Sequence, residues 1–456
     1  MDGASTTEGM VGSRPIAETA AGSDLLRTTW ALAWPVIFTF SIESFVGLCD
    51  MLMVGRLGPT AVAGVGVGVQ ILGAVDTVMF ALGTGVLAIV ARHVGAGERA
   101  EAEETLRQSL GAGAAVAVLI MLPVIAWAPA LVAAFRVNDA VVVAGTRFLR
   151  IVMPAAPASA LLFIMVSSLR GAGDTRTPLA IGATVGTVNV VLAYGLIFGR
   201  LGLPAVGVAG AAIATGALLG LGLLARGRLV LVLRARPARL RLDVVRRVLR
   251  IGYPAAIEHL LMQVGFFLYI VFAAHHGTAA VAAYFIGVRI LALSFLPGFG
   301  FAAAAATMIG QNLGAGRPDD AERSGRAAVR LALWLMTAAG VVILVAARPI
   351  ARLFVADAAV IADTVSFIRV LAACQPLMAL DFTLGGALRG AGDTRFPLLA
   401  VFLGFYVCRL GVAWLVTFAL GLGVVWLWLA LVGDYVARSV LKGARFRSGV
   451  WKTVIV

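Results

Sequence analysis

Long runs of apolar residues, separated by short polar segments, dominate this chain of 456 residues. Many of these runs reach the roughly 20 residues that an α-helix needs to cross the hydrocarbon core of a bilayer. The pattern predicts an all-α integral membrane fold with twelve spans. In the first half they cover residues 30–55, 61–90, 108–128, 141–168, 178–199 and 207–225, and in the second half 251–274, 280–309, 327–347, 360–387, 397–419 and 421–440.

The second half of the chain repeats the first at a constant offset of 219 residues. The clearest match is LRGAGDTRTPL at 169–179, which returns as LRGAGDTRFPL at 388–398 with ten of eleven positions identical. The chain therefore consists of two copies of one unit. Because each copy holds an even number of spans, both copies run in the same direction and are related by an axis along the membrane normal.

The doubled motif lies between the fourth and fifth spans of each copy. Gly171 and Gly173 suit a helix end that turns left-handed, and Asp174 can cap the next helix. The charges of Arg170 and Arg176 hold the loop on one side of the membrane. This composition favours a structural hinge over a binding site.

Charged residues make up 13% of the chain against 61% hydrophobic residues, and the formal net charge is +14. The positive charge gathers in loops that flank spans, with nine arginines between Arg226 and Arg250. Such loops stay cytoplasmic, so both termini are expected to be cytoplasmic. This distribution indicates membrane lipids as partners and argues against nucleic acid.

The expected organisation follows from the spans and the charge. A polar cytoplasmic tail covers residues 1–25 and a first six-helix lobe 26–225; a basic cytoplasmic linker covers 226–250, a second six-helix lobe 251–440 and a basic cytoplasmic tail 441–456.

Cofactor and enzyme chemistry are not expected. The three cysteines lie in apolar runs and the four histidines lack the spacing of metal ligands, so neither a disulfide nor a metal site is predicted. No phosphate-binding loop or nucleophile elbow is present in the sequence.

Two six-helix halves, each with L-R-G-x-G-D-T-R-x-P after its fourth span, resemble the multidrug and toxic compound extrusion (MATE) transporters of bacteria. The segment 50–58 (DMLMVGRLG) and the ending 446–452 (FRSGVWK) are also similar to that family. The resemblance implies an antiporter that rocks two lobes around a central cleft. It would expel organic cations and other amphipathic compounds in exchange for H⁺ or Na⁺.

A charge in mid-bilayer costs about 2.5–3.5 kcal/mol on insertion scales, so an ionisable residue in a span is a functional candidate. By resemblance, Asp50 matches the family's cation-coupling aspartate. Asn189 matches the asparagine of its N-x-x-L-D pattern, and Thr215 can complete the site. The expected second acid is replaced by Ala193.

Three further acids are candidates for substrate binding or for coupling in the second lobe. Glu43 lies two helical turns before Asp50 and on nearly the same face. Glu258 and Asp381 lie in the seventh and tenth spans, where the family also carries acids. For Glu43 the alternative is a hydrogen-bonded pair between helices, whereas the absence of Glu258 and Asp381 from the first copy favours a functional role. A structural role is preferred for Arg289, Arg409 and Asp434, because buried Arg and Asp usually pair with each other.

The sequence thus predicts a monomeric, cation-coupled exporter of lipophilic, cationic compounds in the bacterial cytoplasmic membrane. The alternative is a flippase for lipids or lipid-linked oligosaccharides, a related architecture. Several acids and few arginines in the spans favour cationic cargo over a lipid headgroup. A membrane enzyme or scaffold is disfavoured because no catalytic constellation accompanies the acids.

Overall fold

A computed structural model describes residues 22–200, 202 and 241–454, and the regular elements within these residues are all helical. Eleven helical stretches in this part of the chain are long and apolar enough to cross a membrane. They match, in order, eleven of the twelve predicted spans. The sixth predicted span at 207–225, which includes Thr215, and most of the basic linker lie outside the described residues.

The helices of the first half are α1 (Gly22–Gly55), α2 (Pro59–Gly95), α3 (Arg99–Ala126), α4 (Ala128–Ala133), α5 (Asp139–Val152), η2 (Met153–Ala155), α6 (Ala156–Gly171) and α7 (Arg176–Phe198). In the second half they are α10 (Leu242–His275), α11 (Thr278–Gly314), α12 (Pro318–Val345), α13 (Ala347–Phe354), α14 (Ala358–Gly390), α15 (Arg395–Val401), η3 (Phe402–Leu410), α16 (Gly411–Trp414), η4 (Leu415–Ala419), α17 (Val424–Arg447) and η5 (Val450–Thr453). The segments α5, η2 and α6 form one span, as do α15 to η4.

Several helices extend beyond their predicted spans. The apolar run of α2 was placed at 61–90, but the helix reaches Gly95 and passes Arg92. Backbone hydrogen bonds continue through polar residues until a glycine turns the chain, here Gly97 at φ 78°. Apolar patterning marks the membrane-buried part of a helix, and glycine marks its end.

The repeat is visible in local backbone geometry. Gly97 and Gly316, at equivalent positions, have φ 78° and 71°, and Gly173 and Gly392 have φ 92° and 90°. The short helices α4 and α13 also begin at equivalent positions, although the hydrophobic pattern did not predict either. The two halves are thus copies in structure as well as in sequence.

The doubled motif forms the helix end that its glycines predicted. Gly173 turns left-handed, whereas Gly171 remains helical and packs closely on α2: a Cβ there would lie 2.8 Å from the Leu87 carbonyl oxygen. The backbone N–H of Thr177 donates to Asp174 Oδ1 at 2.9 Å, which caps α7. Only one of the two glycines is therefore needed for the turn, and the other permits helix packing.

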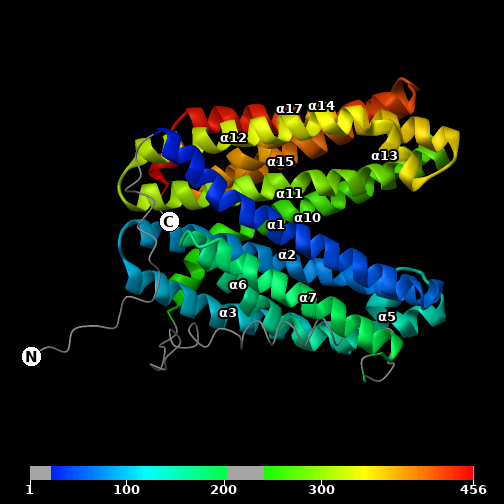
Figure 1. Cartoon of the computed structure of the whole chain (residues 1–456), viewed down its shortest axis with the longest axis horizontal. Coiled ribbons are helices and arrows are strands. Elements are labelled where there is room, and N and C mark those ends of the chain that lie inside the picture. Colours follow the sequence, from blue (N-terminus) through cyan, green and yellow to red (C-terminus); the bar gives the residue numbers. More distant parts are fainter. Residues whose placement is uncertain (1–21, 201, 203–240, 455–456) are drawn as a thin grey trace, which may run out of the picture.

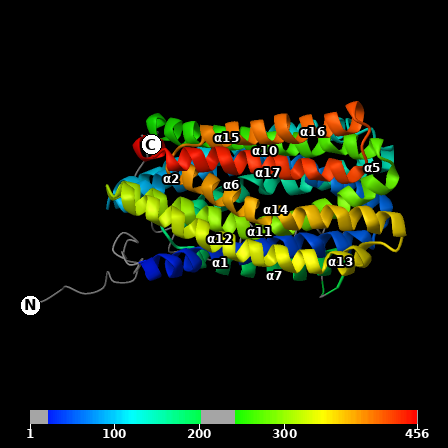
Figure 2. The same cartoon turned by 90° about the horizontal axis from the view of Figure 1, so that it is seen from above.

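Figure 1 shows two groups of helices, one with α11, α14, α15 and α17 and the other with α2, α3, α6 and α7; α1 runs obliquely between them. In Figure 2, the view from above, the long helices run side by side along the long axis. The first helix of each half contacts the other half: α1 packs on α7 and on α11, and α10 packs on α2 and on α15. The halves are therefore joined through α1, α2, α10 and α11.

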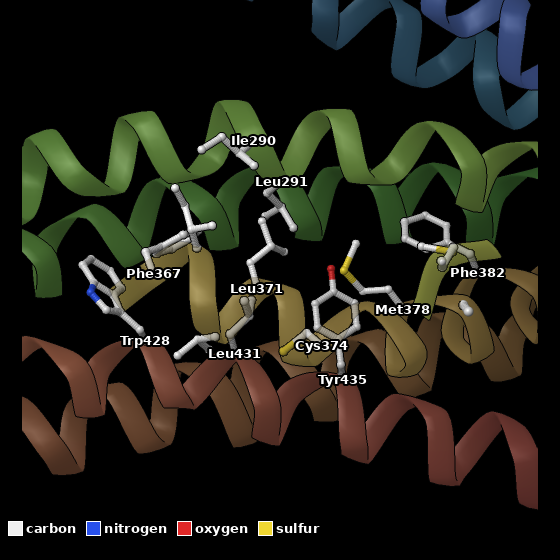
Figure 3. Close-up of a cluster of buried hydrophobic side chains, with 14 of the residues drawn as sticks. Ile290, Leu291, Phe367, Leu371, Cys374, Met378, Phe382, Trp428, Leu431 and Tyr435 are labelled. Atoms are coloured by element: carbon white, nitrogen blue, oxygen red, sulfur yellow. The ribbon is translucent and has the colours of Figure 1, made fainter. Parts of the chain in front are cut away.

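The largest described hydrophobic core lies in the second half, among α11, α14 and α17. Phe367, Leu371 and Met378 of α14 point between the other two helices, and Trp428 and Tyr435 approach them from α17 (Figure 3). The core continues to Leu32 and Ala33 of α1, so burial of apolar surface ties the first helix to the second half.

The ends of the helices next to the doubled motif, called the motif end below, are where the halves pack most closely. A Cβ on Gly95 would lie 2.0 Å from the carbonyl oxygen of Gln311, and one on Gly314 would lie 2.0 Å from that of Arg92. Hydrogen bonds reinforce this contact. The Gln311 side chain donates to the Gly171 carbonyl at 2.9 Å, and Thr307 donates to the Arg170 carbonyl at 2.8 Å.

The final segment is packed, although residues 441–456 were expected to form a tail. The helix α17 continues to Arg447, and Lys442 is 2% exposed. Beyond it, Trp451 stacks on Phe446 with ring centroids 5.0 Å apart, and its Nε1 donates to the Phe446 carbonyl. Burial of the Phe446 and Trp451 rings holds this segment against the helices, although its basic residues had suggested a tail.

Candidate functional site

Asp50 and Asn189, predicted to share a site, are in contact in the first half. The Asn189 side-chain amide donates to both Asp50 carboxylate oxygens, at 3.2 and 3.0 Å. The contact arises because α1 and α7 pack along their lengths. Asn189 is buried, while Asp50 is partly open, and among the described residues the Asn189 Oδ1 atom has no hydrogen-bond partner.

No second carboxylate joins Asp50 and Asn189 from the α7 position where the family pattern carries one. Ala193, one helical turn beyond Asn189, is fully buried in a cluster with Val54 and Ile197. Thr215 lies outside the described residues. The described part of the candidate coupling site therefore consists of one acid and one amide.

Glu43 lies on the exposed surface of α1. It interacts electrostatically with Arg170 of α6 and with Asp76 of α2, but none of the described bases lies within 4.0 Å of its carboxylate. Glu43 and Asp76 thus form an acidic pair of side chains open to solutes. Glu43 remains a candidate for binding a cationic group, and Asp76, which the sequence analysis did not select, lies close enough to act with it.

Glu258 of α10 is in an ion pair with Arg389 of α14. The Arg389 Nη1 atom lies 3.1 and 3.0 Å from the two Glu258 oxygens. The neighbouring His259 contacts α2 instead, with Nδ1 2.9 Å from the Thr77 hydroxyl and its ring stacked on Phe80. Glu258 is therefore neutralised by a base that the sequence analysis had placed in a loop.

Asp381 of α14 lies inside a buried charge network. Lys442 donates to its Oδ1 at 2.5 Å, and Arg438 lies 3.6 Å from its Oδ2. Arg438 also binds Asp434 at 2.6 Å, and Asp434 lies 3.7 Å from Arg409. All five residues are at most 3% exposed.

The contacts in this network are those of a structural element and not of an ion-binding site. Pairing of Arg409 with Asp434 was expected, but the participation of Asp381, Arg438 and Lys442 was not. The three bases exceed the two acids, and the Arg409 guanidinium is held over the rings of Tyr269 and Phe405 at 4.5 and 4.7 Å. Both oxygens of Asp381 are occupied by these bases. The geometry thus favours the structural alternative for this residue.

A cavity of about 90 Å³ lies between the halves. Its walls come from α1, α2, α6, α11 and α14. Its lining combines glycine, alanine and other small residues with four phenylalanines and two arginines: Phe40, Phe80, Phe163, Phe299, Arg170 and Arg389.

Arg170 and Arg389 are the first arginine of each copy of the doubled motif, at equivalent positions in the two halves. The sequence analysis assigned the motif charges to loop orientation, and the structure corrects this for both residues. The helices α6 and α14 continue through Gly171 and Gly390, so each arginine belongs to a last helical turn that faces the cavity. The sequence carried one signal of this placement: in both copies an arginine comes directly before a glycine, at Arg170–Gly171 and Arg389–Gly390.

Comparison with known proteins supports the fold and the repeat. The MatE family model matches residues 35–195 and 254–415, one match in each half. A Bradyrhizobium diazoefficiens protein named "Probable multidrug resistance protein NorM" is 30% identical over 450 residues, covering 93% of this chain and 94% of its own. A Thermotoga maritima protein with the same name is 28% identical over 431 residues and 92% of each chain.

Two solved structures show the same fold at lower identity. A Vibrio cholerae MATE transporter, VcmN, superimposes with a TM-score of 0.88 at 21% identity, over 96% of this chain and 100% of its own. The outward-facing form of a multidrug resistance MATE family transporter gives 0.86 at 23% identity, over 94% and 99%. The family match in both halves, the full-length relatives and the doubled motif agree: the chain belongs to the MatE family and is a multi-pass membrane transporter of the MATE type.

Proposed function

We propose that this protein is a cation-coupled antiporter that exports lipophilic, cationic or amphipathic compounds in exchange for H⁺ or Na⁺. The observation that carries the proposal is the contact between Asp50 and Asn189. A carboxylate inside a span can take up and release a small cation, and an amide that bonds both oxygens holds it in place without neutralising it. The relatives' names, multidrug resistance proteins, support the export of drugs.

The coupling role is assigned to Asp50 because the other acids differ in their surroundings. Glu258 and Asp381 are each bonded to a base. For Asp50 the described partner is a neutral amide, so binding of a cation meets no competing positive charge there. Glu43 and Asp76 then remain for a cationic group on the substrate.

Orientation follows from the charge pattern. The motif end carries the arginine-rich loops, which are expected on the cytoplasmic side of a bacterial cytoplasmic membrane, together with both termini. In this orientation, the close packing of the halves at the motif end closes the cytoplasmic side. Exchange requires a second state in which these contacts open.

The proposal is tested with monomeric protein reconstituted into liposomes. Uptake of a fluorescent lipophilic cation is followed under an imposed pH gradient and, separately, an imposed Na⁺ gradient. Accumulation driven by one gradient and abolished by collapsing it supports antiport. Scrambling of a fluorescent phospholipid without any cation uptake would instead establish the flippase alternative.

A further inference from the structure

His259 of α10 is bonded to the first half through one of its two ring nitrogens. Its Nδ1 atom lies 2.9 Å from the Thr77 hydroxyl of α2. The same hydroxyl donates its hydrogen to the Gly73 carbonyl at 2.9 Å, one turn earlier in α2. A hydroxyl group has a single hydrogen to donate. Since that hydrogen is engaged with Gly73, the bond between His259 and Thr77 is donated by the Nδ1–H group.

This donation determines what the other ring nitrogen can do. In a neutral imidazole one nitrogen carries the hydrogen and the other is an acceptor. With the hydrogen on Nδ1, the acceptor is Nε2. Among the described residues Nε2 has no hydrogen-bond partner, and His259 is half-buried. A proton can therefore be added at Nε2 while the bond between the halves is kept.

The surroundings of the ring suit a positive charge. The His259 ring stacks on Phe80 with centroids 5.5 Å apart and an angle of 29° between the planes. The face of an aromatic ring attracts a cation. Glu258, the next residue along the chain, is the charged group that acts electrostatically on His259, and it is shared with Arg389 of α14. Protonated His259 would thus have an aromatic face and a carboxylate beside it.

The other charges around the middle of α10 leave this position open. Arg409 and Arg438 contact α10 one to two turns farther along, at Phe266 and Met262. The charges of α3 and α15 lie at the motif end. None of the described bases is bonded to His259. The charged groups of the neighbouring helices at this depth are Asp76 of α2, Arg289 of α11, Arg389 of α14, Arg409 of η3 and Arg438 of α17.

The first half repeats the packing of this ring but not its chemistry. The position equivalent to His259 is Phe40, and the position equivalent to Phe80 is Phe299. Phe40 and Phe299 lie with centroids 5.3 Å apart, close to the separation of His259 and Phe80. A phenylalanine therefore serves the same packing in the first half, so packing alone does not account for a histidine in the second.

We propose that His259 is a proton-binding residue of the transporter, which takes up a proton at Nε2 and releases it to water when a cationic compound binds. Thr77, the partner of His259, directly follows Asp76, one of the two acids available to the cationic group of a substrate. A charged imidazolium there repels that group, so the proton and the compound exclude each other. This inference deepens the proposed function by naming a second site for H⁺, and it rests on that function.

The test measures proton release by the purified full chain in nanodiscs of phosphatidylcholine, without any gradient. Tetraphenylphosphonium is titrated by calorimetry between pH 5 and 8, in two buffers that differ in ionisation enthalpy. His259→Gln is expected to lower the release by roughly half a proton per bound cation near pH 6.5, where an ordinary imidazole is half protonated. Its amide keeps an N–H donor for Thr77. His259→Phe keeps the ring on Phe80 instead, and the same loss is expected.

The matched control is the double variant His275→Gln/His276→Gln, which removes two imidazoles at the far end of α10. It is expected to release as many protons as wild type. Release equal to wild type in either His259 variant would overturn the proposal. A loss of the same size in the control variant would also overturn it, because the released proton would then not come from His259.

The two proposals can fail separately. If the His259 variants release as many protons as wild type and gradient-driven uptake persists, His259 has no coupling role and Asp50 keeps its own. If proton release depends on His259 but no gradient drives uptake, the proton site stands and the antiport proposal is rejected.

Discussion

Closure of the motif end is predicted to depend on Gly314. In the structure, a Cβ on this residue would lie 2.0 Å from the Arg92 carbonyl oxygen of α2. Carbon–oxygen contacts in proteins settle near 3.3 Å or more. In Gly314→Ala the helices α2 and α11 must therefore separate by about 1.3 Å at this point, which also strains the hydrogen bond from Gln311 to Gly171.

Overpacking of this kind costs about 1–3 kcal/mol. This penalty destabilises only the state that is closed at the motif end. In any state that is open there, Gly314 and the Arg92 carbonyl oxygen are no longer in contact. A free-energy change of that size shifts the balance between two states by about 5- to 150-fold. Gly314→Ala is thus expected to populate the state open at the motif end.

The assay is labelling of a cysteine introduced as Ser167→Cys in the cavity wall, in a background without the native cysteines. A membrane-impermeant maleimide is applied to sealed vesicles with the motif end outward. Labelling is expected to accelerate at least about fivefold in Gly314→Ala. Gly433→Ala is the matched control, since a Cβ there has no atom within 4 Å. Unchanged labelling in folded Gly314→Ala would refute the assignment of this contact as the closure.

The remaining predictions concern the charge network, the final segment and the coupling site. Asp381→Leu leaves Lys442 buried without its partner and is expected to cost about 3–5 kcal/mol, read as a lower Tm, whereas Asp381→Leu/Lys442→Met recovers most of the loss. Trp451→Ala is expected to destabilise by about 3–5 kcal/mol in the same melting assay, and a wild-type Tm would show that the segment is dispensable. Asn189→Ala removes two hydrogen bonds to the Asp50 carboxylate and is expected to lower gradient-driven uptake about tenfold or more, with substrate binding retained.

The sequence predicted those parts of the fold that depend on hydrophobic length and on the repeat. Apolar runs located eleven described spans in order, because a bilayer imposes one length on every crossing helix. The left-handed turns at Gly173 and Gly392 were predictable from composition, since few other residues adopt that conformation. The π-helical segment η3 and the short helices α4 and α13 were not, because their hydrophobic pattern equals that of an ordinary span or loop.

Residues of the candidate coupling site could be predicted only where a short sequence pattern of the family identifies them. Asp50 and Asn189 were found through the family pattern, and their contact follows from packing of α1 on α7. The partners of Glu258 and Asp381 were missed, because a charge near a span end has the same pattern whether it faces water or a buried acid. Arg389 and Lys442 therefore looked like loop and tail charges until the helices were placed.

The buried bases of the second half are explained in part by the acids that they contact. Arg438 and Lys442 lie one helical turn apart on α17 and both contact Asp381 of α14, while Arg438 also binds Asp434 of its own helix. The network thus ties α14 to α17 through buried ion pairs.

The central claim is that Asp50 couples ion flux to export, and one measurement tests it most directly. Proteoliposomes containing wild type or Asp50→Asn are given a pH gradient or a Na⁺ gradient, and uptake of a lipophilic cation and its equilibrium binding are both measured. The account predicts that one gradient drives accumulation in wild type. It also predicts that Asp50→Asn loses this accumulation while its affinity for the substrate stays within about twofold, since Glu43 and the cavity are untouched. Undiminished gradient-driven accumulation in Asp50→Asn would contradict it.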